Sequence, residues 1–332
     1  MAITVPSVEW SVGEVALMAA AVSRAPSVHN TQPWFLETHG RTASLFERFD
    51  LSLPRHDRAG RDRMISCGAA VTNLRLAVRR LGWAATVAEF ADPDRPDEVA
   101  RVRAGERVAP TARELELFQA IARRRSCRGR FSGMPTKDEV SALVHANTTP
   151  GLNAHLVRDA TEVRALAHRL VYAATTLQHD RAYLRELAAW TTEAGKSTSD
   201  GIPEANLPHG SLPWTGLVGP STRIPDEDVL AERIAAETQL IVLTVGDGRS
   251  DHLHAGMALQ EMWLAATAAG LAASVLTQPL HLHEVRAGLI EAMDLPGYPQ
   301  AILRVGLPSG EVLPTPRRPL ADVIRHRTKG TP

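Results

Sequence analysis

Apolar and polar positions near the start of the chain follow helical and strand periods in turn. Apolar residues at helical spacing over 12–23 predict an amphipathic helix. The runs QPWFLETHG and RTASLFERFD alternate like the two strands of a hairpin that bends at Gly40. SCGAAVTNLRLAVRRLGW predicts a second helix that closes at Gly82, and the following AATVAEF is typical of a strand.

Residues 91–110 are charged and rich in proline, which marks them as the expected internal boundary. Beyond them we expect a helix ending at Arg124, a helix capped by Thr136, and one or two helices over 161–190. LNAHLVRD, QLIVLTVGD and QAILRVGLP are expected strands, ASVLTQPL a strand or loop, and LHAGMALQEMWLAATAAG a buried helix. Helices outweigh strands and interleave with them, which predicts an α+β chain around a central mixed or antiparallel sheet.

The sequence also matches itself. After a shift of 188 positions, residues 68–87 align with residues 256–275, and eight of the twenty positions are identical, including Gly68/Gly256 and Gly82/Gly270. Any alanine-rich helix that ends in glycine matches another to some degree. Because this match continues into the following strand, a duplicated half is favoured, with the two small-residue helices crossing at a pseudo-two-fold axis.

The composition is that of a globular protein without a basic surface. Lys plus Arg and Asp plus Glu both number 37, so the net charge is +0 and nucleic-acid binding is the least favoured role. Hydrophobic residues make up 44% and charged residues 22%, which argues against disorder and against a coiled coil.

Several features predict a soluble, cytoplasmic protein. Cys67 and Cys127 are the only cysteines, too few for a disulfide framework and typical of a reducing compartment. The N-terminal segment lacks the basic start of an export signal, and Glu9 and Glu14 interrupt its apolar stretch. Polar residues and proline break the uncharged run 262–283 before it could span a bilayer, so no membrane association is expected.

Two segments carry candidate chemistry. APSVHNTQPW (25–34) combines Pro26 with the short polar side chains of Ser27 and Asn30, more than a structural turn needs. RRRSCRGRF (123–131) is a dense arginine cluster at the end of a helix. Such a cluster is either an anion clamp, because arginine forks match phosphate oxygens, or a solvated face, which charge alone favours.

Two further patterns offer weaker alternatives. QLIVLTV followed by Gly246-Asp247-Gly248 is similar to a dinucleotide-binding turn, but Asp251 replaces the third glycine and would repel a pyrophosphate. The pairs His252/His254 and His281/His283 would share a face on a strand and could bind a metal. No Cys, Asp or Glu completes a convincing set nearby, so packing or surface histidines are favoured and no metal site is predicted.

Taken together, APSxxNxQPW and RRSxR resemble motifs of the flavin-binding nitroreductase family. The later segments AGMALQEMWLAATAAGLAASVLTQPL and AILRVGLP…PRRPLADVI resemble the closing part of the same family. In the family, RRSxR precedes the QPW motif; here the order is inverted, each motif occurs once, and Gly129 adds one residue before Phe131. The arrangement is similar to the dormancy-associated Acg-type nitroreductase-like proteins, in which two family halves are fused and one site survives.

The resemblance implies a nitroreductase-like fold with an internal pseudo-two-fold duplication that mimics the family homodimer. Its first half would cover 1–108 and its second half 109–332, with an insertion at 191–225 and a C-terminal phosphate-binding arm. One FMN would lie between the halves, and no side chain would need to be catalytic because hydride passes between stacked rings. The residues implied to hold FMN are Pro26, Ser27, Asn30, Arg124, Arg125, Ser126, Arg128, Thr277, Gln278, Pro279, Leu280, and Arg317 or Arg318.

Two functions remain open at this point. One is an oxidoreductase in which NAD(P)H reduces FMN, and FMN reduces a nitroaromatic or quinone-like acceptor. The other is a catalytically poor FMN store in which 191–225 closes over the flavin as a lid. That segment has no helical or strand period, yet it contains Ile202, Leu207, Leu212, Trp214, Leu217 and Val218. A monomer that contains its own pseudo-dimer is expected in either case.

Overall fold

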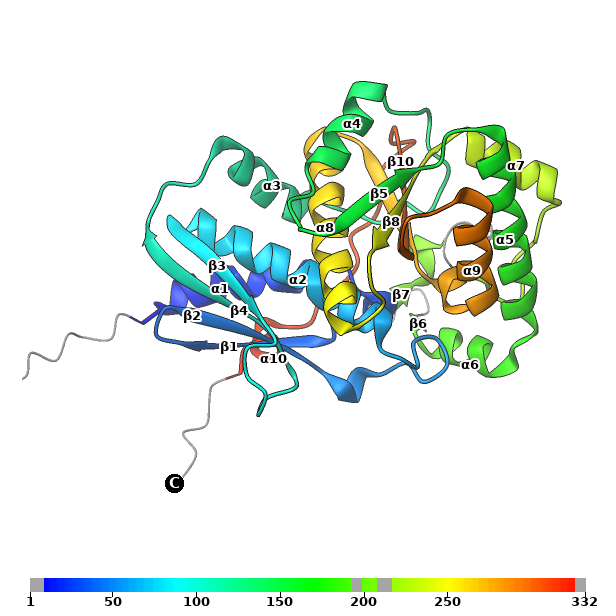
Figure 1. The fold of residues 1–332 in the computed structure, drawn as a ribbon. Helices are drawn as coiled ribbons and strands as arrows, with labels where there is room; N and C mark the ends of the chain where they lie inside the picture. The colour runs from blue at the N-terminus through cyan, green and yellow to red at the C-terminus, as the bar shows by residue number, and fades with distance from the viewer. Residues whose placement is uncertain (1–8, 193–198, 208–216, 326–332) are drawn as a thin grey trace, which may run out of the picture.

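The computed structural model describes residues 9–192, 199–207 and 217–325. Two four-stranded antiparallel sheets lie apart in the molecule, the first at the left of Figure 1 and the second inside the right-hand part, with helices between and around them. The first-half elements are α1 (Val12–Ser23), β1 (Trp34–His39), β2 (Thr42–Glu47), α2 (Arg61–Arg80), β3 (Trp83–Glu89) and β4 (Glu98–Arg107).

The second half adds more helices than strands. Its larger elements are α3 (Ala112–Arg123), α4 (Lys137–His145), β5 (Leu152–Leu156), α5 (Ala160–His179), α6 (Arg181–Ala189), α7 (Glu227–Ala235), β8 (Thr238–Thr244), α8 (Arg249–Ala268), β9 (Ala272–Leu276), α9 (His283–Met293), β10 (Tyr298–Gly306) and α10 (Leu320–Val323). Short pieces are η1 (Val28–Asn30), η2 (Phe49–Leu51), β6 (Thr191–Thr192), β7 (Ile202–Pro203), η3 (Glu204–Asn206) and η5 (Gln278–His281). The α+β prediction is confirmed.

Local chemistry accounts for many of the element boundaries. Ser11 and Glu14 form a capping box at the start of α1, and Thr136 and Glu139 form another at the start of α4. The β1–β2 hairpin bends at Gly40, whose φ of +55° is the left-handed conformation that glycine adopts without a steric cost. These boundaries agree with the expectations from sequence.

The two sheets have the same strand order and connectivity. Their orders are β1-β2-β4-β3 and β5-β8-β10-β9, and every neighbouring pair in both is antiparallel. In the first sheet β2 leads into the twenty-residue helix α2, and the chain then returns as the edge strand β3 and the inner strand β4. In the second sheet β8, the twenty-residue helix α8, the edge strand β9 and the inner strand β10 follow in the same way. The two copies of the internal sequence match therefore occupy equivalent places in the two sheets.

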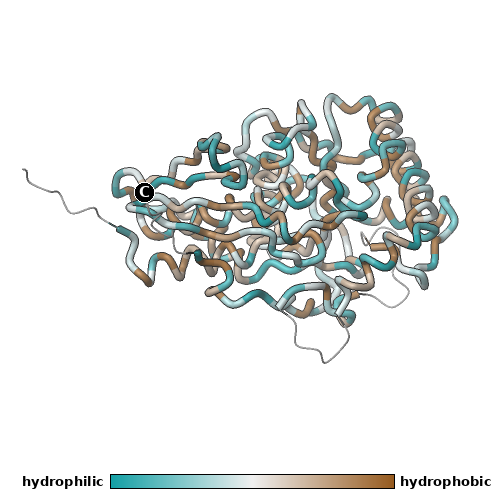
Figure 2. The backbone as a smooth tube through the Cα atoms, turned by 90° about the horizontal axis from the view of Figure 1, so that it is seen from below, coloured by the Kyte–Doolittle hydropathy of each residue, from teal (hydrophilic) through white to brown (hydrophobic). Residues whose placement is uncertain are grey.

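Helices α2 and α8 pack face to face between the sheets. A Cβ atom added at Gly68 would lie 2.1 Å from the Leu253 carbonyl oxygen, and one added at Gly256 would lie 2.0 Å from that of Ile65. Only glycine permits this backbone approach. Nearby, Gln260 donates a hydrogen bond to Asn73 across the same interface (2.8 Å). Hydrophobic stretches gather in this interior, and hydrophilic ones lie mostly at the periphery (Figure 2).

The expected boundary segment 91–110 contains β4, which the sequence did not predict. Val99, Ala100 and Val102 are buried, while most positions from 103 onward are exposed, so the strand is half solvated and its charged residues hide its period. The C-terminal arm crosses back to the first half: Arg325 donates a backbone hydrogen bond to Leu36 of β1 (2.9 Å), beside α10 (Figure 1).

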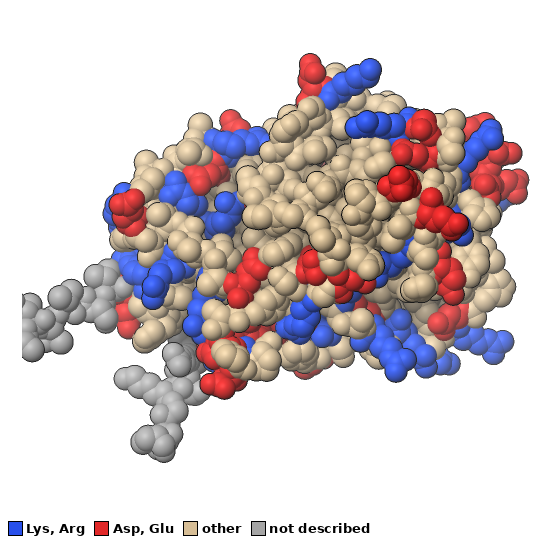
Figure 3. All heavy atoms as spheres, in the orientation of Figure 1, with Lys and Arg blue, Asp and Glu red and all other residues tan. Residues whose placement is uncertain are grey.

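Acidic and basic side chains are interspersed over the face shown in Figure 3, in keeping with the balanced composition. Among the residues that the structure describes, no helix combines the length and apolar character needed to cross a lipid bilayer.

Candidate functional site

A cleft of about 1120 Å³, its open mouth included, brings together segments from both halves of the chain. Its walls come from the turn before β1, the start of α2, the arginine segment after α3, the end of β9 and the C-terminal arm. Nine of the thirteen residues expected to hold FMN line it: Pro26, Ser27, Asn30, Arg124, Arg125, Ser126, Arg128, Thr277 and Arg317.

The turn before β1 has a strained backbone. His29, Asn30 and Gln32 have φ values of 46°, 57° and 51°, and none of them is glycine. Each residue held in this left-handed region costs about 1–3 kcal/mol, and such strain clusters at functional sites. Ser27 stabilises the turn, because its Oγ accepts a hydrogen bond from the Gln32 amide (3.0 Å).

Asn30 joins three distant segments at one wall of the cleft. Its Nδ2 donates to the carbonyl oxygens of Gly201 and Pro316, both at 3.0 Å, and its Oδ1 accepts from Arg317 Nη1 at 2.9 Å. Gln32, which was not assigned to the site from sequence, also joins distant segments. Its Nε2 donates to the Ser199 carbonyl oxygen and its Oε1 accepts from the Arg318 amide, both at 2.8 Å. These amides position the C-terminal arm and residues 199–201 over the site.

Five arginines line the cleft, and within the described part of the chain none of them forms an ion pair with a carboxylate: Arg24, Arg124, Arg125, Arg128 and Arg317. Arg124 is only 5% exposed, and its guanidinium lies 4.6 Å from the centre of the Trp263 ring. Its Nη2 donates to the Arg24 carbonyl at 3.0 Å, but its Nε has no hydrogen-bond partner among the residues that the structure describes. Buried arginines are normally paired, so this cluster has the charge and the donors that suit a bound anion.

The pKa values of these arginines reflect the same excess of buried positive charge. Burial lowers the pKa of Arg124 well below its ordinary value, and the neighbouring positive charges of Arg317 and Arg125 lower it further. Burial also lowers the pKa of Arg128 to about 10 and that of Arg317 to about 10. A bound anion would favour the charged form of every one of them.

The arginine segment is fixed against the second sheet. Ser126 forms an isolated parallel bridge with Ala273 of β9, and the Cys127 amide donates to the Ala273 carbonyl at 2.9 Å. Residues 124–128 therefore run along the edge of β9, where Arg124, Arg125, Ser126 and Arg128 line the cleft. Cys127 is buried beside them, and burial raises the pKa of its thiol.

Four of the expected FMN contacts do not line the cleft. Gln278, Pro279 and Leu280 form the buried η5 turn directly after Thr277. Arg318 forms an ion pair with Asp200 instead. Their roles toward FMN stay predictions.

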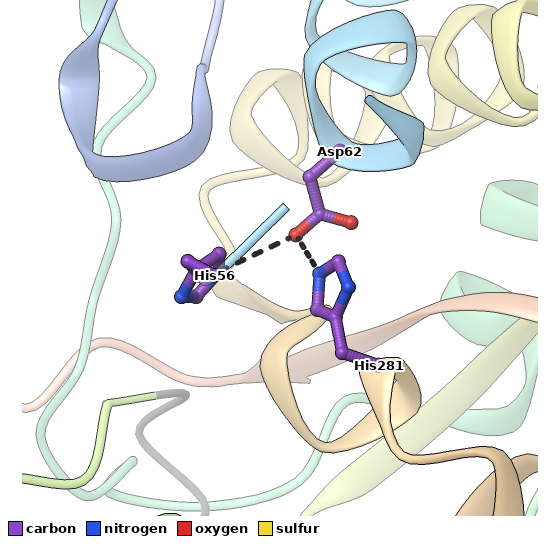
Figure 4. Close-up of side chains that lie close together, drawn as sticks. All are labelled: His56, Asp62 and His281. Carbon is purple, nitrogen blue, oxygen red and sulfur yellow. Dashed lines mark ion pairs between the residues drawn. The ribbon is translucent and has the colours of Figure 1, made fainter. Parts of the chain in front are cut away.

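A group of buried side chains adjoins the cleft at the start of α2 (Figure 4). His29 Nε2 lies 3.1 Å from His56 Nδ1, and His56 Nε2 lies 3.6 Å from Asp62 Oδ2. His281 Nε2 is 2.9 Å from the same oxygen, in an ion-pair contact whose angle is not that of a hydrogen bond. The sequence singled out only His281, in its pair with His283, because the other members of the group come from distant parts of the chain.

The group has the ligand types of a small metal site, since the ligand atoms of His56, Asp62 and His281 all lie within 4.8 Å of one another. Asp62 is, however, already engaged: Arg61 donates to its Oδ1 at 3.1 Å and 3.2 Å, and the Thr277 hydroxyl donates to its Oδ2. Burial raises the pKa of the Asp62 carboxyl, but His281 and Arg61 outweigh burial and hold that pKa well below its ordinary value. The arrangement is that of a buried, ionised carboxylate with its own donors.

The other weak patterns have structural explanations. Asp251 accepts hydrogen bonds from the amides of Gly246 (3.2 Å) and Gly248 (2.9 Å), the groups that a pyrophosphate would need. His252 and His254 lie on α8 and not on a strand, and each has its own acidic partner, Asp247 at 3.0 Å and Glu89 at 2.7 Å.

Comparison with known proteins identifies the family. A model of the nitroreductase family matches residues 121–307, which contain RRSxR, β9 and β10. The chain belongs to the nitroreductase family. Within this nitroreductase chain, the match begins just before the arginine segment that lines the cleft.

Relatives of this nitroreductase are found in Mycobacterium tuberculosis H37Rv. The protein named "Putative NAD(P)H nitroreductase Rv3131" is 33% identical over 311 residues, covering 91% of this chain and 88% of the relative. The protein named "Putative NAD(P)H nitroreductase acg" is 31% identical over 312 residues, covering 92% of this chain and 93% of the relative. Both alignments are longer than the segment that the family model matches.

Solved nitroreductase structures are more distant. A Bacteroides fragilis nitroreductase crystallised with bound FMN is 18% identical, with a TM-score of 0.40, and covers 61% of this chain and 95% of its own. The FMN-dependent nitroreductase NfnB from Mycobacterium smegmatis, in complex with NADPH, is 16% identical, with a TM-score of 0.42, and covers 64% of this chain and 97% of its own.

Proposed function

We propose that this protein binds FMN in the cleft and uses NAD(P)H to reduce a nitroaromatic or quinone-like acceptor. The observation that carries the proposal is the cluster of five cleft arginines without a described carboxylate partner. Family membership supports a flavin, and the two relatives are named as NAD(P)H nitroreductases. FMN supplies the redox chemistry when bound, by taking a hydride and passing it on.

The arginines fit the phosphate end of FMN. Arg124 Nε and Arg317 Nε are buried donors with no acceptor in the described part of the chain, and a phosphate offers acceptor oxygens for both. Arg128 makes no hydrogen bond to any described residue, so its whole guanidinium is available to the cleft. Ser126 stands between these arginines and adds a hydroxyl donor of the kind that a phosphate or ribityl oxygen accepts.

The remaining walls fit a flat aromatic ring. Ile65, Leu259 and Trp263 line the cleft from α2 and α8, and Ile202 and Leu217 line it from the segment after α6. Apolar walls with a few convergent polar groups are typical of cofactor pockets. These side chains exclude water from the ring while the arginines fix the opposite end of the ligand.

We also propose that the two halves form a pseudo-dimer within one monomeric chain, divided near residues 108 and 109. The shared strand order of the two sheets and the crossing of α2 with α8 at Gly68 and Gly256 support it. Each site motif occurs once, so one FMN per chain is expected. The two free, buried cysteines support a reducing, cytoplasmic location.

A second candidate function is FMN storage. Residues 199–202 are tied to the cleft through the bonds of Gln32, Asn30 and Arg318, and Ile202 and Leu217 line the cleft itself. A segment held in this way would slow the access of NAD(P)H and acceptor. Leu212 and Trp214, which the sequence placed in the lid, lie outside the described residues.

One experiment separates these functions. The purified protein is heated to release flavin, the flavin is quantified by fluorescence, and the intact protein is mixed anaerobically with NADPH or NADH while its absorbance is followed. One FMN per chain, with fast bleaching and reoxidation by a quinone, supports the enzyme. FMN that bleaches only over hours supports storage, and colourless protein that takes up no added FMN refutes both.

A further inference from the structure

We propose that His29, His56 and Asp62 form a proton relay that delivers a proton to the acceptor in the cleft, with His29 as the donor. This inference rests on the proposed function. It assigns a role to buried polar side chains that FMN binding does not explain.

His29 is held at the cleft by the strained turn. Its φ of 46° is part of that turn, its side chain lines the cleft, and only 4% of the residue is exposed. Its Nε2 faces His56 Nδ1 at 3.1 Å. Its other ring nitrogen, Nδ1, makes no hydrogen bond within the described part of the chain, so it is available to a ligand.

His56 is fixed between His29 and Asp62. Its backbone amide donates to Glu186 Oε1 at 2.6 Å, and its ring stacks on Tyr183 with the centroids 5.9 Å apart. Asp62 is fixed in turn, because Arg61 and Thr277 donate to its two oxygens. The three groups therefore follow one another along the wall of the cleft in the order imidazole, imidazole, carboxylate.

The carboxylate sets the direction of the relay. An ionised carboxylate only accepts hydrogen bonds, so His56 presents Nε2–H toward Asp62. An additional proton then occupies Nδ1 of His56 and is donated to Nε2 of His29, whose Nδ1–H faces the cleft. Burial lowers the pKa of His29, His56 and Arg128 lower it further, and Asp62 opposes them, so His29 is held in the neutral form that donates Nδ1–H.

Proton donation moves the two imidazoles from one pair of tautomers to the other. His29 gives its Nδ1 proton to the acceptor while the Nδ1 proton of His56 passes to Nε2 of His29. Both rings are then neutral, and His56 keeps its Nε2–H directed toward Asp62, 3.6 Å away, throughout. A proton that enters from the solvent side of the cleft onto Nδ1 of His29 returns the Nε2 proton of His29 to Nδ1 of His56 and so restores the starting state.

The stoichiometry of the reaction provides a use for this proton. A quinone becomes a hydroquinone by gaining a hydride and one proton, and a nitro group becomes a nitroso group and water by gaining the same. The hydride comes from the reduced cofactor, and the proton is the one that His29 supplies. Hydride transfer from NAD(P)H to the oxidised cofactor needs no such proton, so the two half-reactions depend on the relay differently.

The decisive experiment measures the two half-reactions separately by stopped-flow absorbance. His29→Gln and His56→Gln are compared with the parent, and His283→Gln, an exposed residue outside the group, is the matched control. We expect unchanged FMN content and unchanged reduction by NAD(P)H, but reoxidation by a quinone slowed by about 10²-fold, the scale of a lost general acid. Imidazole in the buffer should partly restore the rate of His29→Gln.

A second measurement does not depend on turnover. Histidine-ring ¹⁵N NMR of the FMN-bound protein should show a protonated Nε2 on His56, and Asp62→Asn should abolish that signal while His283→Gln retains it. Stoichiometric Zn²⁺ binding that His56→Gln removes would instead make the group a metal site and overturn the relay. Variants that reoxidise as fast as an active parent would also overturn it. A parent that binds no FMN or reduces no acceptor refutes the proposed function, which is a different result.

Discussion

Arg128 offers a sharp test of the cleft because the chain supplies its own control. Arg128 lines the cleft and contacts no described acid, whereas Arg130, two residues later, is exposed. Replacing each by alanine removes one positive charge from the same segment. If the cluster holds the phosphate of FMN, Arg128→Ala weakens binding and Arg130→Ala has little effect.

The magnitude follows from the kind of bond that is lost. A hydrogen bond to a charged group contributes about 1.5–3 kcal/mol. Since about 1.4 kcal/mol is a factor of ten, the dissociation constant for FMN should rise by about 10- to 150-fold. The same substitution should not destabilise the apoprotein. Burial already lowers the pKa of Arg128 to about 10, so in the absence of FMN its removal relieves a crowded cluster of one positive charge.

The assay is fluorescence titration of the apoprotein with FMN and, separately, with riboflavin, which lacks the phosphate. Arg128→Ala should lose affinity for FMN and keep the parental affinity for riboflavin, which also shows that the fold is intact. Equal FMN affinity in parent, Arg128→Ala and Arg130→Ala would refute the phosphate clamp and make the cluster a solvated face. An equal loss for FMN and riboflavin would show that Arg128 acts on the fold or on the ring.

Three further predictions concern stability. Gly68→Ala should lower the free energy of unfolding by about 1–3 kcal/mol because its Cβ would strike the α8 backbone. Gly13→Ala, the control in open space, should be neutral or stabilising. Urea unfolding that shows an equal loss of stability in both variants would contradict the close helix crossing. Hydrogen bonding from Arg79 lowers the pKa of Glu114 to about 2, so this pair stabilises the fold above about pH 4.5. That stabilisation is lost as the pH falls toward 2. Arg79→Met should flatten the dependence of the free energy of unfolding on pH over this range, and an unchanged dependence would count against the pair. Removing FMN should lower the Tm in scanning calorimetry, and added FMN should restore it in a concentration-dependent way; an unchanged Tm would speak against binding.

Short-range patterns in the sequence were sufficient for most elements. Helix α1, the hairpin at Gly40 and the Thr136 cap all depend on residues within a few positions of one another, so local periodicity and capping chemistry predicted them. The two site motifs also proved informative together, because seven of their residues predicted to bind FMN meet in one cleft.

Strand β4 shows where local pattern fails. Its first residues are buried, but its later, exposed positions carry arginine and glutamate, and it follows a turn rich in proline and aspartate. Composition alone therefore favoured a linker. The strand forms because β2 and β3 supply hydrogen-bonding partners on both of its edges, and partner strands are not visible in a local window.

The sequence by itself determined the element types, the internal match and the residues that could meet an anion. Only the tertiary structure decided which of them meet. Arg317 donates a hydrogen bond to Asn30, and Asp62 contacts His281, each across more than two hundred residues. From sequence, His281 could be paired only with its neighbour His283. The physical reason is that burial and proximity give these side chains their charge state and their partners, and both arise only when the two halves pack around α2 and α8.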